Sequence, residues 1–156
     1  MTAPSDDAVF RPVNQQGRSG PGSGGPLLVA PSSATDGEFG IFEIEVAVGA
    51  RPVTPHYHSG FTESFYILEG VVKLRLGDEK VVAGPGDFAF VPRNGLHGFQ
   101  NAGDATARML IIFTPGIPRE EYFRELGELY RRRTPPTREE MDAVALRHDQ
   151  VNVHDA

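Results

Sequence analysis

The chain has 156 residues, no cysteine and a formal net charge of −6 at pH 7. This length is typical of one domain and is sufficient to bury a hydrophobic core. The absence of cysteine excludes disulfide bonds, thiolate zinc sites and thiol nucleophiles, and the acidic balance argues against nucleic-acid binding. No apolar segment approaches membrane-spanning length, so we expect a cytoplasmic protein with no nucleic-acid or membrane partner.

The sequence divides into three parts. Residues 1–25 form a polar, Gly- and Ser-rich stretch that we interpret as a flexible N-terminal arm. Its one apolar patch, Val9–Val13, is expected to lie on the body of the fold. Residues 26–115 alternate short apolar segments with Gly- and Pro-rich turns, whereas residues 116–156 show helical periodicity.

The central part predicts an all-β structure. Residues 39–48 alternate apolar and polar side chains with period two, and the last apolar segment, residues 108–114, shows two apolar faces. Gly77-Asp78 is a favourable two-residue hairpin turn. Turn signals recur about every eight to ten residues and separate about nine strands, which is typical of an antiparallel sandwich or barrel.

The C-terminal part predicts two short helices that pack on the outside of the barrel or across one end. Pro118 suits the start of the first helix, and Thr137 with Glu140 forms a capping box for the second. His148 and His154 lie in a polar tail and are expected to be surface residues. The first helix carries an apolar stripe that we expect to serve packing rather than ligand binding: Tyr122, Phe123, Leu126, Leu129 and Tyr130.

Two histidines in the central part are placed to bind one ion together. His56 and His58 are two positions apart, so on a strand their side chains share a face. Pro52 and Pro55 disfavour a helix, in which the two rings would point roughly 200° apart. A single strand histidine is usually only hydrogen-bonded, but this pair has further partners.

Glu63 follows the pair by five residues, and His97 follows a Pro/Gly loop that precedes the next strand. If Glu63 points inward, three imidazoles and one carboxylate converge inside the barrel. Such donors suit Zn, Fe, Mn, Co, Ni or Cu. Four protein donors leave one or two positions on a five- or six-coordinate ion, so the pattern predicts one divalent transition metal ion that is accessible to a substrate.

These segments resemble the two sequence motifs of the cupin superfamily. The first motif is matched by His56-x-His58-x4-Glu63-x6-Gly70 and the second by Gly86-x5-Pro92-x4-His97-x3-Asn101. Two glycines, Gly49 and Gly95, are each displaced by one position. The displacements affect turns and leave the ligand positions unchanged.

The resemblance implies a single cupin β-barrel, also called a double-stranded β-helix or jelly roll, followed by short C-terminal α-helices. It implies that His56, His58, Glu63 and His97 are metal ligands and that Glu63 is also a catalytic base. It further implies a homodimer, in which edge strands and the Val9–Val13 patch pair across the two-fold axis. Within the family, the chain is similar to small single-domain bacterial cupins related to quercetin 2,3-dioxygenase.

Three functions are compatible with these residues. The first is a metal-dependent dioxygenase that reacts O2 with a flavonol-like or other enolisable aromatic small molecule. The second is a non-redox metal-dependent isomerase, cyclase or lyase of a natural-product or sugar pathway, for which Arg51, Arg93 and Arg108 are candidate carboxylate-binding residues. The third is a cupin that binds a small molecule without catalysis.

A dioxygenase of this kind needs an apolar substrate pocket. The inward face of residues 88–91 and of the last strand cannot be assigned from the pattern, because both faces are apolar. The candidate lining residues are Phe65, Ile67, Phe88, Phe90, Phe99, Met109, Ile111 and Phe113.

Overall fold

The computed structural model describes residues 2, 7–20 and 25–154. Nine strands occupy the predicted positions, and the all-β prediction with two short C-terminal helices is confirmed. Their bounds are β1 Leu27–Ala30, β2 Gly40–Val46, β3 His56–Tyr57, β4 Thr62–Glu69, β5 Val72–Leu76, β6 Glu79–Ala83, β7 Phe88–Val91, β8 His97–Asn101 and β9 Ala107–Thr114.

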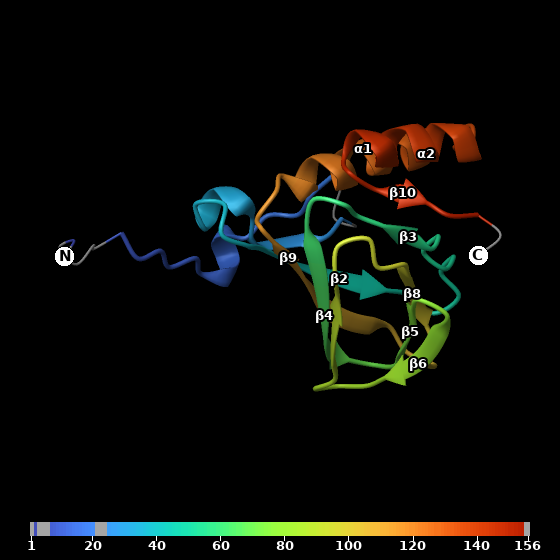
Figure 1. Cartoon of the computed structure of the whole chain (residues 1–156), viewed down its shortest axis with the longest axis horizontal. Coiled ribbons are helices and arrows are strands. Elements are labelled where there is room, and N and C mark those ends of the chain that lie inside the picture. Colours follow the sequence, from blue (N-terminus) through green and yellow to red (C-terminus); the bar gives the residue numbers. More distant parts are fainter. Residues whose placement is uncertain (1, 3–6, 21–24, 155–156) are drawn as a thin grey trace.

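Two antiparallel five-stranded sheets face each other and form the barrel. One sheet has the order β1-β2-β9-β4-β7, and the other has the order β3-β8-β5-β6 with a further short strand, β10 (Val151–Asn152), beside β3. Figure 1 shows the two sheets on opposite sides of the barrel. The sequence did not predict β10, which pairs with β3 and brings the C-terminal tail beside the histidine pair.

The hydrophobic core fills the space between the sheets. The alternation predicted for β2 is present, because Phe42, Ile44 and Val46 are buried whereas Glu45 is exposed. Other strands of both sheets add further fully or almost fully buried side chains, namely Phe65, Ile67, Val72, Leu74, Met109, Ile111 and Phe113. Burial of apolar side chains contributes roughly 1.5–3 kcal/mol for each one, so this layer makes a large favourable contribution to folding.

Two residues of the sequence motifs have structural roles. Gly70 ends β4 with φ = 78°, and a Cβ atom there would lie 2.7 Å from Cα of Ala107. The Asn101 side chain donates to the carbonyl oxygens of Val46 and Ala105, both at 2.8 Å, and ties the end of β8 to two other segments. These positions fix turns of the barrel and contribute no side chain to the metal-ligand group.

The C-terminal helices lie across one end of the barrel (Figure 1). Their bounds are α1 Arg119–Arg131 and α2 Arg138–Arg147, and the predicted capping box of Thr137 and Glu140 is present at α2. Phe123 of α1 packs against Phe42 of the barrel with ring centroids 5.6 Å apart. Within the described ranges, no helix is long and apolar enough to cross a membrane.

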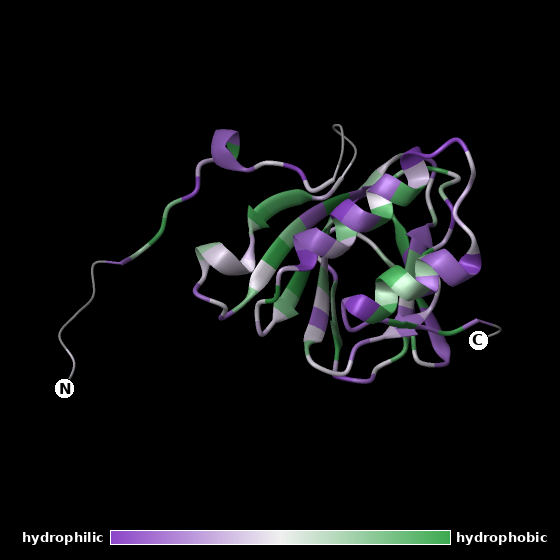
Figure 2. Cartoon of the chain, turned by 90° about the horizontal axis from the view of Figure 1, so that it is seen from above, coloured by the Kyte–Doolittle hydropathy of each residue, from purple (hydrophilic) through white to green (hydrophobic). Residues whose placement is uncertain are grey.

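The expectation for Val9–Val13 is met only in part within one chain, because Arg11 donates to the carbonyl oxygens of Leu28 and Val29 in β1 but the apolar side chains do not pack on the barrel. Val9, Phe10 and Val13 are 66%, 85% and 75% exposed. Figure 2 shows a hydrophobic stretch of this arm away from the barrel. Two short 3₁₀ helices, η1 (Val13–Gln15) and η2 (Ser32–Ala34), precede and follow β1. Residues 21–24, between η1 and β1, lie outside the described part.

Candidate metal centre

Strand β3 and the residue directly after it present two histidines to the barrel interior. His56 and His58 are 4% and 2% exposed, and the ring of His58 stacks on Phe61 with a centroid distance of 4.2 Å. The strand is held on both sides, because His56 pairs with His97 of β8 and with Asn152 of β10. The two prolines before β3 therefore lead into an extended segment, as the sequence predicts.

Glu63 and His97 reach the same point from two other strands. Glu63 lies on the inward face of β4 with Phe65 and Ile67, and His97 begins β8 and is completely buried. The loop before His97 is anchored to the first motif, since the backbone N–H of Asn94 donates to the carbonyl oxygen of His58 at 2.7 Å.

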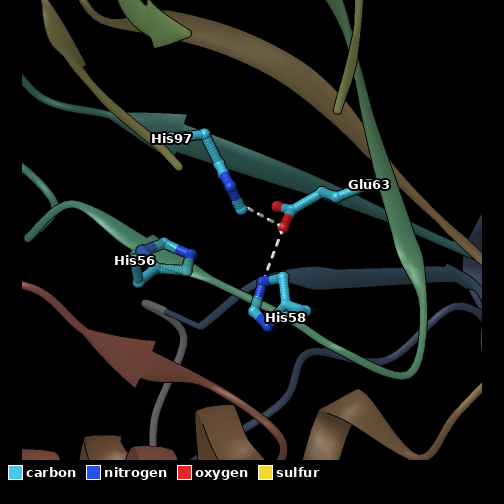
Figure 3. A group of neighbouring side chains, drawn as sticks. All are labelled: His56, His58, Glu63 and His97. Carbon is cyan, nitrogen blue, oxygen red and sulfur yellow. Dashed lines mark hydrogen bonds and ion pairs between the residues drawn. The ribbon is translucent and has the colours of Figure 1, made fainter. Parts of the chain in front are cut away.

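The four side chains point toward one another (Figure 3). One ligand-type atom from each of His56, His58, Glu63 and His97 lies within 4.8 Å of the others. Oε2 of Glu63 is 2.9 Å from Nε2 of His58 and 2.8 Å from Nε2 of His97. The structure thus brings together all four residues that the sequence singled out.

The other nitrogen of each histidine ring faces a backbone carbonyl. Nδ1 of His56 lies 2.7 Å from the oxygen of Thr54, Nδ1 of His97 lies 2.9 Å from that of Gly95, and Nδ1 of His58 lies 2.7 Å from that of Asp149. A carbonyl oxygen only accepts, so each Nδ1 carries the proton. The Nε2 atoms are consequently directed at the centre of the group, where an Nε2 that loses its proton offers a lone pair.

Burial and mutual charge shift the pKa values in this group. Burial lowers the pKa of His56 to about 3, and the charge of His97 acts in the same direction. Burial would raise the pKa of Glu63, but hydrogen bonds from His58 and His97 hold it well below its usual value. For His97, Glu63 outweighs the effect of burial and raises the pKa. Without a metal, these shifts favour the ionised form of Glu63 and the protonated form of His97, which then donates from Nε2 to Glu63.

Comparisons with known proteins agree with this fold and site. The family model described as "Cupin domain" matches residues 42–113, which include all four residues of the group. The chain is 34% identical to a quercetin 2,3-dioxygenase of Bacillus subtilis over 124 residues. The chain belongs to the cupin superfamily.

The cupin relatives differ in length and in name. The match covers 80% of this cupin but only 35% of the Bacillus protein. The tetracenomycin polyketide synthase protein TcmJ of Streptomyces glaucescens is 36% identical, over 60% of this chain and 62% of that protein. A Klebsiella pneumoniae protein with a double-stranded β-helix domain aligns with a TM-score of 0.54, 17% identity and coverage of 71% of this chain and 93% of that one. The last comparison supports the fold alone.

The residues present fit a metal ion. Three Nε2 atoms and a carboxylate oxygen converge in a buried space, and once the rings are neutral their lone pairs and the carboxylate are electrostatically favourable only around a cation. Metal-binding histidines commonly donate their second ring N–H to a carbonyl or carboxylate, and all three rings here have such an acceptor. Nitrogen and oxygen donors without thiolate fit a divalent transition metal, whose identity the donor set leaves open.

A cavity of about 230 Å³ lies between the metal-ligand group and the C-terminal helices. Of the predicted pocket residues, Phe99, Ile111 and Phe113 line this cavity, as do His56 and Glu63. Phe65, Ile67 and Met109 are buried in the barrel core and are not among the lining residues. A separate hollow of about 170 Å³, lined by residues such as Lys73, Arg75 and Lys80, contains no member of the metal-ligand group.

The placement of two predicted pocket residues is wrong. Phe88 and Phe90 are 62% and 55% exposed, whereas Ala89 is half-buried and Val91 is buried on the same strand. The inward face of β7 thus carries the smaller side chains. The two phenylalanines lie on the outer face of the sheet, away from any substrate in the barrel.

The C-terminal segment contributes residues to the cavity that the sequence analysis assigned to packing or to the surface. The apolar stripe of α1 both packs and lines the cavity, through Tyr122, Phe123, Leu126 and Tyr130. His154 also lines it, and its Nε2 lies 2.9 Å from Oδ2 of Asp142, so it is not a free surface residue. His148 is likewise half-buried and paired, 3.0 Å from Glu125.

The three candidate arginines differ in where they lie. Arg51 lines the cavity, but Arg93 is exposed and Arg108 pairs with Glu43 and Glu69 away from it. A further arginine, Arg119, is buried beside the cavity and was not predicted. Its only sequence signal is its place at the start of the helix after Pro118.

Proposed function

We propose that this cupin is a metal-dependent dioxygenase that acts on a flavonol-like or other enolisable aromatic small molecule. The observation that carries the proposal is the opening of the buried three-histidine, one-glutamate group onto a cavity with aromatic walls. The quercetin 2,3-dioxygenase relative supports it, although this chain spans about a third of that protein.

In this proposal, His56, His58, Glu63 and His97 hold one divalent transition metal ion. The ion would supply a Lewis acid and, if redox-active, a path for electrons between substrate and O2. The carbonyl acceptors on the three Nδ1 atoms keep the rings oriented with Nε2 inward. The protein therefore fixes the donor geometry before any substrate enters.

Glu63 is the proposed base for the acidic hydroxyl group of the substrate. Its carboxylate is ionised in the metal-free centre and lines the cavity, so one of its oxygens can accept the enol or phenol proton. Asp142 also lines the cavity, but it is already bound to Asn152 and His154. Phe99 and Phe113 on the barrel side exclude water from the reacting atoms.

The second candidate function is a non-redox metal-dependent isomerase, cyclase or lyase. The observation that favours it is that part of the cavity wall is polar, and the resemblance to a polyketide synthase protein is compatible with it. A polar wall suits a substrate with several carbonyl or carboxyl oxygens. The polar residues of this wall are Arg51, Arg119, Asp142, Gln150, Asn152 and His154.

Oxygen consumption separates the candidates. Metal-replete protein is mixed with flavonols and other enolisable aromatic compounds, and O2 uptake is recorded together with substrate loss. We expect O2 uptake in step with substrate loss, and at least about a 100-fold lower rate in Glu63→Gln. Glu45→Gln, an exposed carboxylate change on β2, is the matched control and should retain the wild-type rate.

Two other outcomes contradict the dioxygenase. Substrate loss without O2 uptake assigns the second candidate function. Binding without any conversion, in protein shown to contain the metal, assigns a non-catalytic small-molecule-binding cupin. The metal content of Glu63→Gln is measured in the same samples, because Glu63 is also a proposed ligand.

A further inference from the structure

Arg119 is a buried cation without a paired carboxylate. Its side chain is only 3% exposed, and within the described part of the chain no carboxylate oxygen lies in ion-pair contact with it. Arginine is rarely fully buried unless it is paired, because removing its charge from water is costly. The other buried charged residue of the cavity, Glu63, is bound by two histidines.

The contacts of Arg119 leave part of its guanidinium unused. One terminal nitrogen donates to the carbonyl oxygen of His148 at 3.2 Å, and the other donates to Oε1 of Gln150. The group stacks on the Tyr122 ring, 3.9 Å from its centroid. The Nε atom is buried and has no hydrogen-bond partner. A guanidinium carries five N–H groups in a planar fork, so donors remain for one more acceptor.

This guanidinium borders the cavity of the metal centre. Arg119, His56 and Glu63 all line it, and Arg119 is close enough to act electrostatically on both Glu63 and His97. In Figure 3 the helices lie on the side of the group where His56 and His58 are drawn. Aromatic rings occupy the space beside Arg119, with Phe113 and Phe123 centroids 5.8 and 5.7 Å from its guanidinium carbon.

We propose that Arg119 binds an anionic oxygen of the substrate, and that the substrate is a small aromatic compound carrying a carboxylate or a comparably acidic oxygen. The aromatic walls receive its ring, and the guanidinium receives its charge. The cavity of about 230 Å³ is smaller than the roughly 300–1,000 Å³ of sites for drug-sized ligands, which favours a compact substrate. This inference rests on the proposed function in one respect, the placement of substrate in this cavity.

A purely structural role accounts for only part of the observations. Arg119 does join the start of α1 to the C-terminal tail through His148 and Gln150. A neutral donor such as glutamine could make those two contacts without a buried charge. The unpaired charge and the unpartnered Nε are explained if a ligand anion completes the pair.

The test uses benzoate and benzamide, two probes of nearly equal shape that differ in charge. Binding to full-length protein is measured by calorimetry, both metal-loaded and after EDTA treatment. We expect wild type to bind benzoate about 10- to 100-fold more tightly than benzamide in both forms, the range expected for a charge-assisted hydrogen bond. Equal affinities for the two probes, or no detectable binding of either, would overturn the proposal.

Variants then assign the preference to Arg119. Arg119→Met should lose the preference for benzoate, and Arg119→Lys should retain part of it. Arg124→Met is the matched control, because it removes the same charge from an exposed position of the same helix and should keep the preference. A folded Arg119→Met that still prefers benzoate contradicts the proposal, as does an equal loss in Arg124→Met. If Arg119→Met does not fold, the comparison of benzoate with benzamide in wild type and in Arg119→Lys still tests the proposal.

Failure of this inference is distinguishable from failure of the proposed function. The EDTA-treated protein tests the anion site without any metal. A benzoate preference in protein that shows no O2 uptake would support Arg119 and reject the dioxygenase. O2 uptake in a protein with no benzoate preference would support the dioxygenase and reject the role of Arg119.

Discussion

Three backbone carbonyl groups determine what the histidines of this centre can do. The oxygens of Thr54, Gly95 and Asp149 each accept from an Nδ1–H and so direct an Nε2 atom inward. Two of these carbonyls are two residues from the histidine that they orient. The third belongs to a residue 91 positions after His58, and only the folded tail brings it there.

The low pKa of His56 predicts an acid-sensitive metal-free protein. Its pKa is about 3 in the folded state, against 6.5 for an unperturbed histidine side chain. Between these values the unfolded chain binds a proton that the folded chain does not, so the free energy of unfolding decreases as pH falls. The contribution is fully present above pH 6.5 and changes by up to about 1.4 kcal/mol per pH unit below it.

This effect can be measured between pH 6.5 and 4.5. In that window His97, whose pKa is raised, is protonated in the folded state, and Glu63, whose pKa is lowered, is ionised there. Urea unfolding in EDTA should show a shallower pH dependence for His56→Asn than for wild type. Parallel pH dependences for the two proteins would show that His56 is not the buried neutral group described here.

Local geometry predicts the histidine pair of the four-residue group, and the resemblance to the cupin motifs adds Glu63 and His97. Alternation on a strand places His56 and His58 on one face whatever the rest of the fold does. Arg119 has no such local signal, since an arginine at a helix start is ordinarily solvated. Its burial depends on Tyr122 and on the tail residues His148 and Gln150, which the chain brings together only in three dimensions.

At the scale of elements, strands with one polar face were predictable and strands with two apolar faces were not. Glu43 and Glu45 mark the outer face of β2, and its inward residues are those expected. Strand β7 has the sequence Phe-Ala-Phe-Val, so periodicity gives no direction, and its larger side chains lie outside. Only pairing with β4, which sets Phe88 opposite Tyr66 and Phe90 opposite Ser64, fixes its orientation.

The C-terminal helices show a similar limit. The capping box located α2 correctly, because its two hydrogen bonds are local. The apolar stripe of α1 indicated a buried face but could not show that this face also closes a cavity. The two-residue strand β10 is too short to give a pattern, although it places Asn152 opposite His56.

At the scale of the whole molecule, the predicted homodimer has a candidate surface. The outer face of the β1-β2-β9-β4-β7 sheet carries apolar side chains that neighbour one another in register: Tyr66, Phe88, Phe90, Leu110 and Ile112. The apolar arm residues Val9, Phe10 and Val13 are also exposed. Soluble monomers rarely expose a contiguous apolar patch larger than a few hundred Å².

A second copy of the chain is the occupant we expect on this surface. Two-fold pairing buries the same apolar face on both copies and lets each arm reach the other copy. Light scattering coupled to size exclusion should give a dimer for wild type and a monomer for Phe90→Glu. Val82→Glu, an exposed valine on the other sheet, is the matched control and should stay dimeric. A monomeric wild type, or a Phe90→Glu protein that remains dimeric, would contradict this interface.

The central claim is that one metal ion occupies the three-histidine, one-glutamate group, and metal content tests it most directly. Untagged protein purified without chelator is analysed by elemental mass spectrometry, with His97→Ala as the test variant and His148→Ala as the control outside the group. We expect about one equivalent of a divalent transition metal in wild type and His148→Ala, and little in His97→Ala. If zinc is the only metal found in the purified protein, the result favours the non-redox candidate function. Protein that binds no metal even after reconstitution, or His97→Ala that binds as much as wild type, would contradict the account.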